Sequence, residues 1–167
     1  MKNKIIPITF TIVVIIVFIC LFASIKQPVV VCEKIVEDDL GIVVGEELNV
    51  VINGNDIDSM KLVKKITISD KYINDIDNIM FSLEKSYEYL GDKVSIVVEE
   101  NQIFILVEIA DEETIILDNI SFSDNNRLFI NVNSNTKSND VITLKVGEEY
   151  TEGELMTRLK NKGYSCR

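Results

Sequence analysis

The chain has 167 residues and a net charge of −10, from 27 acidic and 17 basic side chains. A chain this acidic repels phosphate backbones, so its composition argues against nucleic-acid binding. It contains no histidine, which excludes serine–histidine and cysteine–histidine catalysis within the chain and removes the commonest transition-metal ligand.

The first segment with a clear pattern is an uncharged, largely apolar run at residues 5–25. As a helix this run spans about 31 Å, close to the ~30 Å hydrocarbon core of a bilayer. Lys2 and Lys4 precede it and only Lys26 follows before the acids begin, so the positive-inside rule places the N-terminus in the cytoplasm. We therefore expect a cytoplasmic stub at 1–4, a transmembrane anchor at 5–25, a linker leading into the first strand at 26–31 and an extracytoplasmic domain at 32–167.

A cleaved signal peptide is the alternative for the same segment. Such a peptide has an apolar core of about 7–15 residues that ends in small residues. This run is longer, and the bulky Phe22 stands where a small residue is expected before Ala23 and Ser24. Both alternatives place the domain outside the cytoplasm, and the anchor predicts a single-pass protein of the cell membrane.

The first part of the domain predicts β-strands. In chain order we expect a short strand at 29–31 leading into Cys32, an acidic loop or irregular hairpin at 33–45, an alternating strand at 46–52 and, after a turn at Asn53-Gly54-Asn55-Asp56, a second alternating strand at 57–68. The expected inward side chains are Leu48, Val50, Ile52, Met60, Leu62, Ile66 and Ile68, with Lys61, Lys65 and Thr67 outward. Lys64 interrupts the inward row, which indicates a sheet edge or a β-bulge.

The most regular element is a helix predicted at residues 70–90, with Ser69 or Asp70 as its N-cap. Its apolar side chains recur every three or four positions, which places them in one stripe along a helix. The stripe consists of Ile73, Ile76, Ile79, Met80, Leu83, Tyr87 and Leu90. Gly91 is expected to end the helix in a left-handed conformation.

The rest of the chain predicts further strands and a short helix. The expected elements are a hairpin of strands 94–99 and 103–109, a hairpin of strands 114–122 and 127–132, a polar loop at 133–139 and a strand at 141–146. A capping box of Thr151 and Glu154 then begins a short helix, which Gly163 ends. The predicted fold class is α+β: an antiparallel β-sheet of hairpins with one long and one short C-terminal helix, preceded by a single transmembrane helix.

Three cysteines lie far apart in the sequence. Cys20 falls within the predicted anchor, where it acts as a small apolar residue. Cys32 opens the extracytoplasmic domain and Cys166 nearly closes it, so an oxidising compartment favours a disulfide between them. Closing a loop of this length stabilises a fold by up to about 5 kcal/mol in the chain-entropy model. The alternative is two free thiols, because low-GC bacteria use few disulfides. A metal site is not expected, because two distant cysteines without histidine make an incomplete set of ligands.

Several features occur together along the chain. They are the apolar N-terminus, Val31-Cys32-Glu33 before an acidic stretch, a strand pair across Asn53-Gly54, an amphipathic helix ending near Leu90 and the ending Thr151-Glu152-x-Glu154-Leu155…Leu159-x-x-x-Gly163-Tyr164-Ser165-Cys166. This layout resembles small, anchored extracytoplasmic proteins of low-GC bacteria, akin to the YehR-like lipoproteins. The chain departs from them because no lipobox precedes Cys20. The resemblance implies no activity and no functional residues.

Acidic side chains recur in short groups, at Asp56 and Asp58, at Asp75 and Asp77, and at 111–113. No group has the ligand spacing of an EF-hand loop, and Asp75 and Asp77 lie about 200° apart on a helix. The sequence also lacks tryptophan and a glycine-rich phosphate loop. We therefore predict no enzymatic activity, no catalytic residue, no metal site and no cofactor.

Two hypotheses for function follow. The first is a non-catalytic, membrane-tethered extracytoplasmic domain that acts through contacts with a protein or another component of the envelope. The alternative is an extracytoplasmic module that binds a cation or a small apolar molecule. An enclosed pocket supports the alternative, whereas a filled core with an exposed sheet edge supports the interaction domain.

Overall fold

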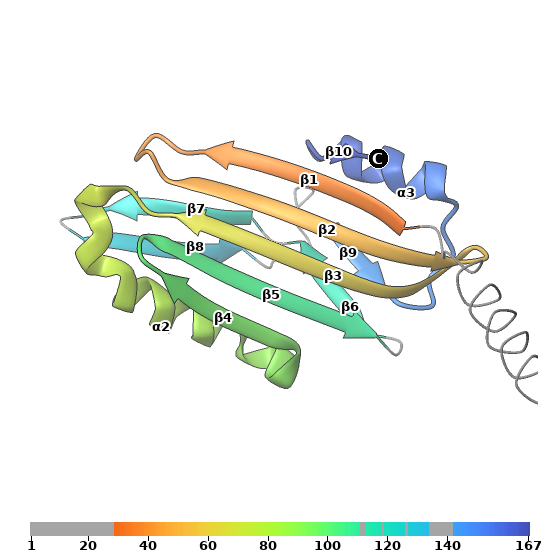
Figure 1. Ribbon diagram of the computed structural model, residues 1–167, viewed down its shortest axis with the longest axis horizontal. Coiled ribbons are helices and arrows are strands. Elements are labelled where there is room, and N and C mark those ends of the chain that lie inside the picture. The colour runs from red at the N-terminus through yellow and green to blue at the C-terminus, as the bar shows by residue number, and fades with distance from the viewer. Residues whose placement is uncertain (1–28, 111–112, 118, 126, 134–141) are drawn as a thin grey trace, which may run out of the picture.

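A computed structural model describes residues 29–110, 113–117, 119–125, 127–133 and 142–167 of the chain. Its main layer is a six-stranded antiparallel sheet in the order β10-β1-β2-β3-β5-β4 (Figure 1). The strands are β1 (Val29–Glu37), β2 (Val43–Asn53), β3 (Asp56–Thr67), β4 (Val94–Glu99), β5 (Gln102–Ala110) and β10 (Ser165–Cys166).

The second layer consists of two strand pairs and two helices. The strand pairs are antiparallel: β6 (Thr114–Leu117) with β9 (Ile142–Lys145), and β7 (Asn119–Asp124) with β8 (Leu128–Asn133). Both pairs lie behind the six-stranded sheet in the view of Figure 1. The helices are α2 (Ile76–Tyr87), flanked by the 3₁₀-helices η1 (Asp70–Asp75) and η2 (Glu88–Lys93), and α3 (Glu152–Lys160). The helix α2 contacts β8 and β4, and α3 contacts β1 and β10.

The hydrophobic core lies between the two layers. Because side chains alternate across a strand, every second residue of β2 points inward. The buried side chains include Leu48, Val50, Leu62, Ile66, Ile105 and Val107 from the large sheet, and Leu83, Ile115, Leu117, Leu128, Leu144, Leu155 and Leu159 from the second layer. A register shift between Val51 and Ile52 lets both Ile57 and Met60 of β3 point inward. No described element covers the other face of the sheet, which lies toward the viewer in Figure 1.

The predicted fold class is wrong. The described chain is mostly antiparallel β structure in three sheets, rather than an α+β domain built on one sheet of hairpins. Among the described residues no helix is long and apolar enough to cross a membrane. The predicted anchor at 5–25 lies outside those residues.

The loop or irregular hairpin predicted at residues 33–45 is mostly regular strand. The strand β1 continues to Glu37 and β2 already begins at Val43. The Asp38 side chain makes this short connection possible, because its Oδ1 accepts hydrogen bonds from the backbone N–H groups of Leu40 and Ile42 at 2.9 Å each. Because the Asp38 side chain satisfies these backbone donors, a short turn takes the place of the longer loop that the acidic composition indicated.

The hairpin predicted from strands 114–122 and 127–132 is wrong for its first strand. Only β7 pairs with β8, whereas β6 pairs with β9 from much later in the sequence. The physical reason is the alternation of side chains. Ile115 and Leu117 are buried at odd positions, but the partly buried apolar side chains of β7 are Ile120 and Phe122, at even positions. One continuous strand places odd and even positions on opposite faces, so the segment divides into two strands with different partners.

The helix predicted at 70–90 is present, but only its middle part, α2, is α-helical. A 3₁₀-helix has three residues per turn, so the periodicity of the stripe changes in η1. Tyr72 is buried there, whereas Ile73, predicted to face inward, is 44% exposed. Gly91 breaks the helix, as predicted, but its φ of 60° and ψ of −125° are not the left-handed helical conformation that was expected, and η2 continues past it to Lys93.

Two other local predictions are confirmed. The strands β4 and β5 form the expected hairpin, with Glu100 and Asn101 between them. The helix α3 begins with the capping box of Thr151 and Glu154, and Gly163 beyond its end has a φ of 86°. Both signals lie within a few residues of the element that they define.

Candidate functional site

An ion pair is buried inside the six-stranded sheet. Lys64 of β3 lies directly opposite Glu46 of β2, with Lys64 Nζ 2.9 Å from Glu46 Oε1. The exposed fraction of Lys64 is 0%. The expectation that Lys64 marks an edge or a bulge is therefore wrong, because β3 lies between β2 and β5 and the register shift lies elsewhere, between Val51 and Ile52. A charge at this depth needs a close partner, since an isolated buried charge is very costly.

Tyr164 adds a third side chain to this group from the far end of the chain. Its buried hydroxyl donates a hydrogen bond to Glu46 Oε2. The end of α3 positions it: Gly163 takes a left-handed conformation, and the backbone N–H of Tyr164 bonds the carbonyl oxygen of Leu159 at 3.2 Å. Lys34 Nζ lies 5.5 Å from the centre of the tyrosine ring. The C-terminal segment thus helps to hold the Glu46 carboxylate.

Cys166 follows Tyr164 by two residues, and the fold brings it to Cys32, the partner that the sequence favoured. The sulfur atoms of Cys32 and Cys166 are at disulfide-bonding distance, 1.98 Å, and their Cα atoms are 4.1 Å apart. Arg167 exchanges two backbone hydrogen bonds with Val31 and forms a 2.8 Å ion pair with Glu33. The strand β10 is short, but the contact between the two cysteines joins it to β1, and a backbone ladder and an ion pair join the adjacent Arg167 to β1.

Sequence reasoning missed the group of Glu46, Lys64 and Tyr164, although the sequence holds a signal for its first two members. In the β2–β3 hairpin Leu48 lies opposite Leu62. The same register, moved along by one inward position, places Glu46 opposite Lys64. Opposite charges at facing inward positions predict a cross-strand ion pair. All three side chains are buried, so they contact a substrate only if the sheet opens.

The other edge of the sheet is formed by β4, which pairs only with β5 in the described chain. Residues 94–98 of this strand carry no charge and include no proline. Val98, on the inward face, remains 37% exposed, and Val97, on the outward face, remains 48% exposed. The strand therefore presents an open backbone edge flanked by apolar side chains.

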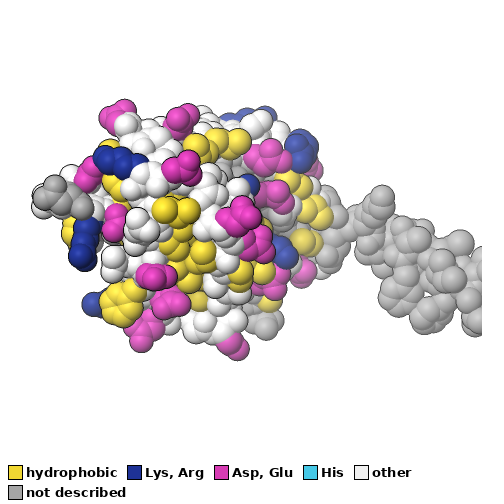
Figure 2. Space-filling model, turned by 60° about the vertical axis from the view of Figure 1, so that its left-hand side comes forward, with side chains coloured by type: hydrophobic (Ala, Val, Ile, Leu, Met, Phe, Trp, Pro, Cys, Tyr) yellow, Lys and Arg dark blue, Asp and Glu magenta, His cyan; other side chains and the backbone are white. Residues whose placement is uncertain are grey.

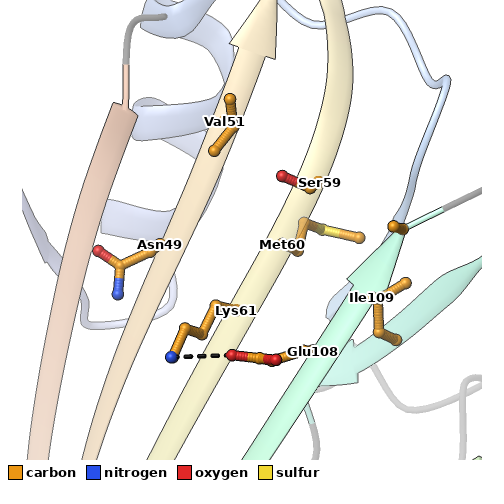
Figure 3. Close-up of a pocket in the computed structure, with 8 residues that line it drawn as sticks. Asn49, Val51, Ser59, Met60, Lys61, Glu108 and Ile109 are labelled. Atoms are coloured by element: carbon orange, nitrogen blue, oxygen red, sulfur yellow. Dashed lines mark ion pairs between the residues drawn. The ribbon is translucent and has the colours of Figure 1, made fainter. Parts of the chain in front are cut away.

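The outward face of the large sheet has two shallow depressions. One, of ≈ 430 Å³, lies over β2, β3 and β5, and Figure 3 shows the Lys61–Glu108 ion pair, 2.8 Å long, at its side. The other, of ≈ 440 Å³, reaches β4, and its apolar lining consists of Val63, Val97, Phe104 and Leu106. Both depressions are open to solvent. In Figure 2 hydrophobic side chains are visible at the surface among acidic ones.

The charged surface groups contact one another rather than an open cavity. Lys71 Nζ lies 2.7 Å from Asp124 Oδ2 and 2.6 Å from the Tyr72 hydroxyl. These hydrogen bonds, the one to Asp124 above all, raise the pKa of Lys71. Asp75 accepts a 3.0 Å hydrogen bond from the first backbone N–H of β8. Within the described residues no group of three or more histidine, cysteine or acidic side chains is arranged for a metal ion, and residues 111–112 lie outside that part of the chain.

No protein-family model matches the chain, and no characterised protein or solved structure matches it. The resemblance to the YehR-like lipoproteins therefore stays a prediction. Two candidate regions follow from the geometry, namely the buried group of Glu46, Lys64 and Tyr164 at β2 and β3, and the open edge at β4. Of the two, β4 is accessible to another molecule without any rearrangement of the core.

Proposed function

We propose that this protein is a non-catalytic, membrane-tethered extracytoplasmic domain that acts by binding a protein through the β4 edge. The observation that carries the proposal is the outer edge of β4 at the end of the large sheet, which no strand of the described chain pairs with and which is uncharged from Val94 to Val98. An open edge offers a row of backbone donors and acceptors to an incoming strand.

The lack of protection at β4 supports this proposal. Natural proteins usually block an open edge with lysine, proline, a bulge or a covering element, because open edges promote aggregation. At the other end of the sheet β1 has such a cover, in β10 and α3. In the described chain β10 pairs with only part of β1, whereas no strand pairs with the outer edge of β4 anywhere along its length, which fits an edge that is used in binding.

The form of the surface favours a protein partner over a small ligand. A small-molecule site normally encloses most of its ligand in a concave pocket. The depression that reaches β4 is shallow and lies on an exposed sheet face, and the other lies over β2, β3 and β5, away from β4. The depression at β4 suits side chains of a docked strand, which need contact on one side only.

Tethering rests on the sequence. The apolar segment at 5–25 holds the domain at the membrane, and the basic residues before it keep the N-terminus in the cytoplasm. A reporter that is active only outside the cytoplasm, fused after Arg167, is expected to be active, and the protein is expected to stay with membranes after a high-salt wash. Recovery of a mature fragment beginning near Ile25 contradicts the tether and supports a cleaved signal peptide.

The binding proposal is tested with one substitution on each edge. Val97→Lys places a charge on the exposed face of β4, whereas Ile35→Lys places the same charge on β1, at a side chain that is 77% exposed. The full chain is purified from its native membranes in each form. We expect Val97→Lys to lose a co-purifying protein that wild type and Ile35→Lys retain. Equal recovery from all three contradicts a role for β4.

A further inference from the structure

The pairing rules of antiparallel strands limit how β4 can meet a copy of itself. Two such strands are related by a two-fold axis perpendicular to the sheet, and residues that face each other point to the same side. For the inner faces of both copies to form one surface, an inward residue must face an inward residue. The two-fold axis must therefore lie midway between one residue and the same residue of the second copy, rather than between two neighbouring residue pairs.

With the axis at Ile96, the edge of β4 is complementary to itself. Lys93 then faces Glu99 of the second copy, and symmetry repeats this ion pair at the other end. Between these charges the facing pairs are Val94 with Val98, Ser95 with Val97, and Ile96 with its counterpart. This single register therefore places the oppositely charged ends of the two strands opposite each other and the two uncharged centres opposite each other.

The neighbouring registers lack this match. With the axis at Val97, Glu99 faces Ser95 and Lys93 faces an uncharged asparagine at position 101. With the axis at Ser95, the charge of Asp92 faces the apolar Val98. Lys93, the residue before β4, also forms an ion pair with Glu113 at the surface, where its side chain is 39% exposed.

We infer that β4 pairs antiparallel with β4 of a second copy of this chain, centred on Ile96, so that two six-stranded sheets form one continuous sheet. This inference rests on the proposed function and names its partner. The exposed area of Val97 and Val98 is what such a contact covers. When the two-fold axis lies along the membrane normal, Val29 has the same height above the membrane in both copies. Both N-terminal segments then start at the same distance from the membrane, so tethering allows the pairing.

A charge exchange in the full chain tests the inference. Glu99→Lys and Lys93→Glu each create two like-charged pairs in a dimer, and we expect either to reduce dimer formation in membranes by roughly five- to thirtyfold. Co-expression of the two variants in differently tagged copies restores both ion pairs and is expected to restore the mixed dimer. Because Lys93→Glu also breaks the contact with Glu113, Glu113→Gln is the matched control and should dimerise like wild type. Failure of the mixed dimer to recover overturns the inference.

Cross-linking reads out the register directly. In a Cys20→Ser background, Ser95→Cys in one tagged copy and Val97→Cys in the other should form an intermolecular disulfide, while Ile35→Cys on β1 should form none. A disulfide between two Val97→Cys copies in place of the mixed product overturns the register centred on Ile96.

A photo-reactive residue at position 97 of the full chain separates this inference from the proposed function. Adducts that contain only this chain support the dimer. An adduct with a different protein overturns the dimer but leaves the proposed function standing. With no adduct of either kind, both fail.

Discussion

The β1 edge of the large sheet is covered by β10, the Cys32–Cys166 contact and α3, whereas the β4 edge has no strand beyond it in the described chain. The inward side chains record this difference. Val30 and Cys32, in the part of β1 that β10 and α3 cover, are fully buried, whereas Val36 of β1 beyond that part is 48% exposed and Val98 of β4 is 37% exposed, although both point inward. A strand at the end of a sheet is buried only as far as its cover extends.

From this comparison we assign stability to the β1 side of the sheet and binding to its β4 edge. The β1 side contains the cysteines and the capped helix, and Tyr164 links it to the ion pair buried between β2 and β3, so changes there should alter the free energy of unfolding. Changes on the exposed face of β4 should alter association and leave folding nearly unchanged.

The largest effect is expected from Glu46→Gln. This substitution leaves the Lys64 ammonium buried without its counter-charge, so the free energy of unfolding of the full chain should fall by about 3–5 kcal/mol. Denaturant unfolding monitored by circular dichroism measures it. As a control, the combined change Glu46→Leu, Lys64→Met and Tyr164→Phe removes all three polar groups and should be far less destabilising than Glu46→Gln. If the combined variant is less stable than Glu46→Gln, the loss of the counter-charge to Lys64 does not explain the destabilisation.

The cysteine pair comes next. Cys166→Ser should lower the free energy of unfolding by about 2–4 kcal/mol, because the unfolded chain is no longer closed into a large loop. It should also speed amide exchange at Val31, whose N–H bonds the carbonyl oxygen of Arg167 at 3.0 Å. Mass spectrometry of protein from its native envelope, with and without reductant, reports the oxidation state. Two free thiols in that sample refute the disulfide.

The capping box of α3 should contribute less. Thr151→Ala removes the cap of a short helix and should cost about 1 kcal/mol. Hydrogen bonds from the Thr151 hydroxyl and then from its backbone N–H lower the pKa of Glu154 below its ordinary 4.5. A lowered carboxylate pKa contributes stability that is present above 4.5 and lost as the pH falls through the folded-state value. Unfolding measured from pH 6 down to pH 3 should therefore show a smaller difference between wild type and Thr151→Ala at the acidic end; a constant difference argues against the coupling.

The smallest effect on folding is expected at β4. Val97→Lys should change the free energy of unfolding by less than about 0.5 kcal/mol, because the side chain is 48% exposed and packs on one side only. The same substitution is expected to abolish association. Thermal unfolding and co-purification of one preparation compare the two directly. A loss of stability as large as that of Cys166→Ser shows instead that β4 belongs to the structural part of the sheet.

The elements that the sequence predicted best depend on residues close together in the chain. The inward side chains of β2 and β3, the β4–β5 hairpin and the capping box of Thr151 and Glu154 all follow from local alternation, turn or capping chemistry. Of the candidate regions, the sequence indicated only the cysteine pair, because Cys32 and Cys166 lie at the two ends of the domain. That β4 lies at an edge was not visible, since no residue within the strand records how many neighbours it has.

The sequence by itself determined where most strands and helices lie, and which side chains of β2 and β3 point inward. Tertiary structure alone decided that β6 pairs with β9 rather than continuing into β7, that Lys64 is buried, and which sheet edge is covered. The hydrogen bond between Glu46 and Tyr164 joins residues 118 positions apart. Contacts of this kind form only when distant segments compete for the same core, so they depend on the packing of the whole chain and not on any local pattern.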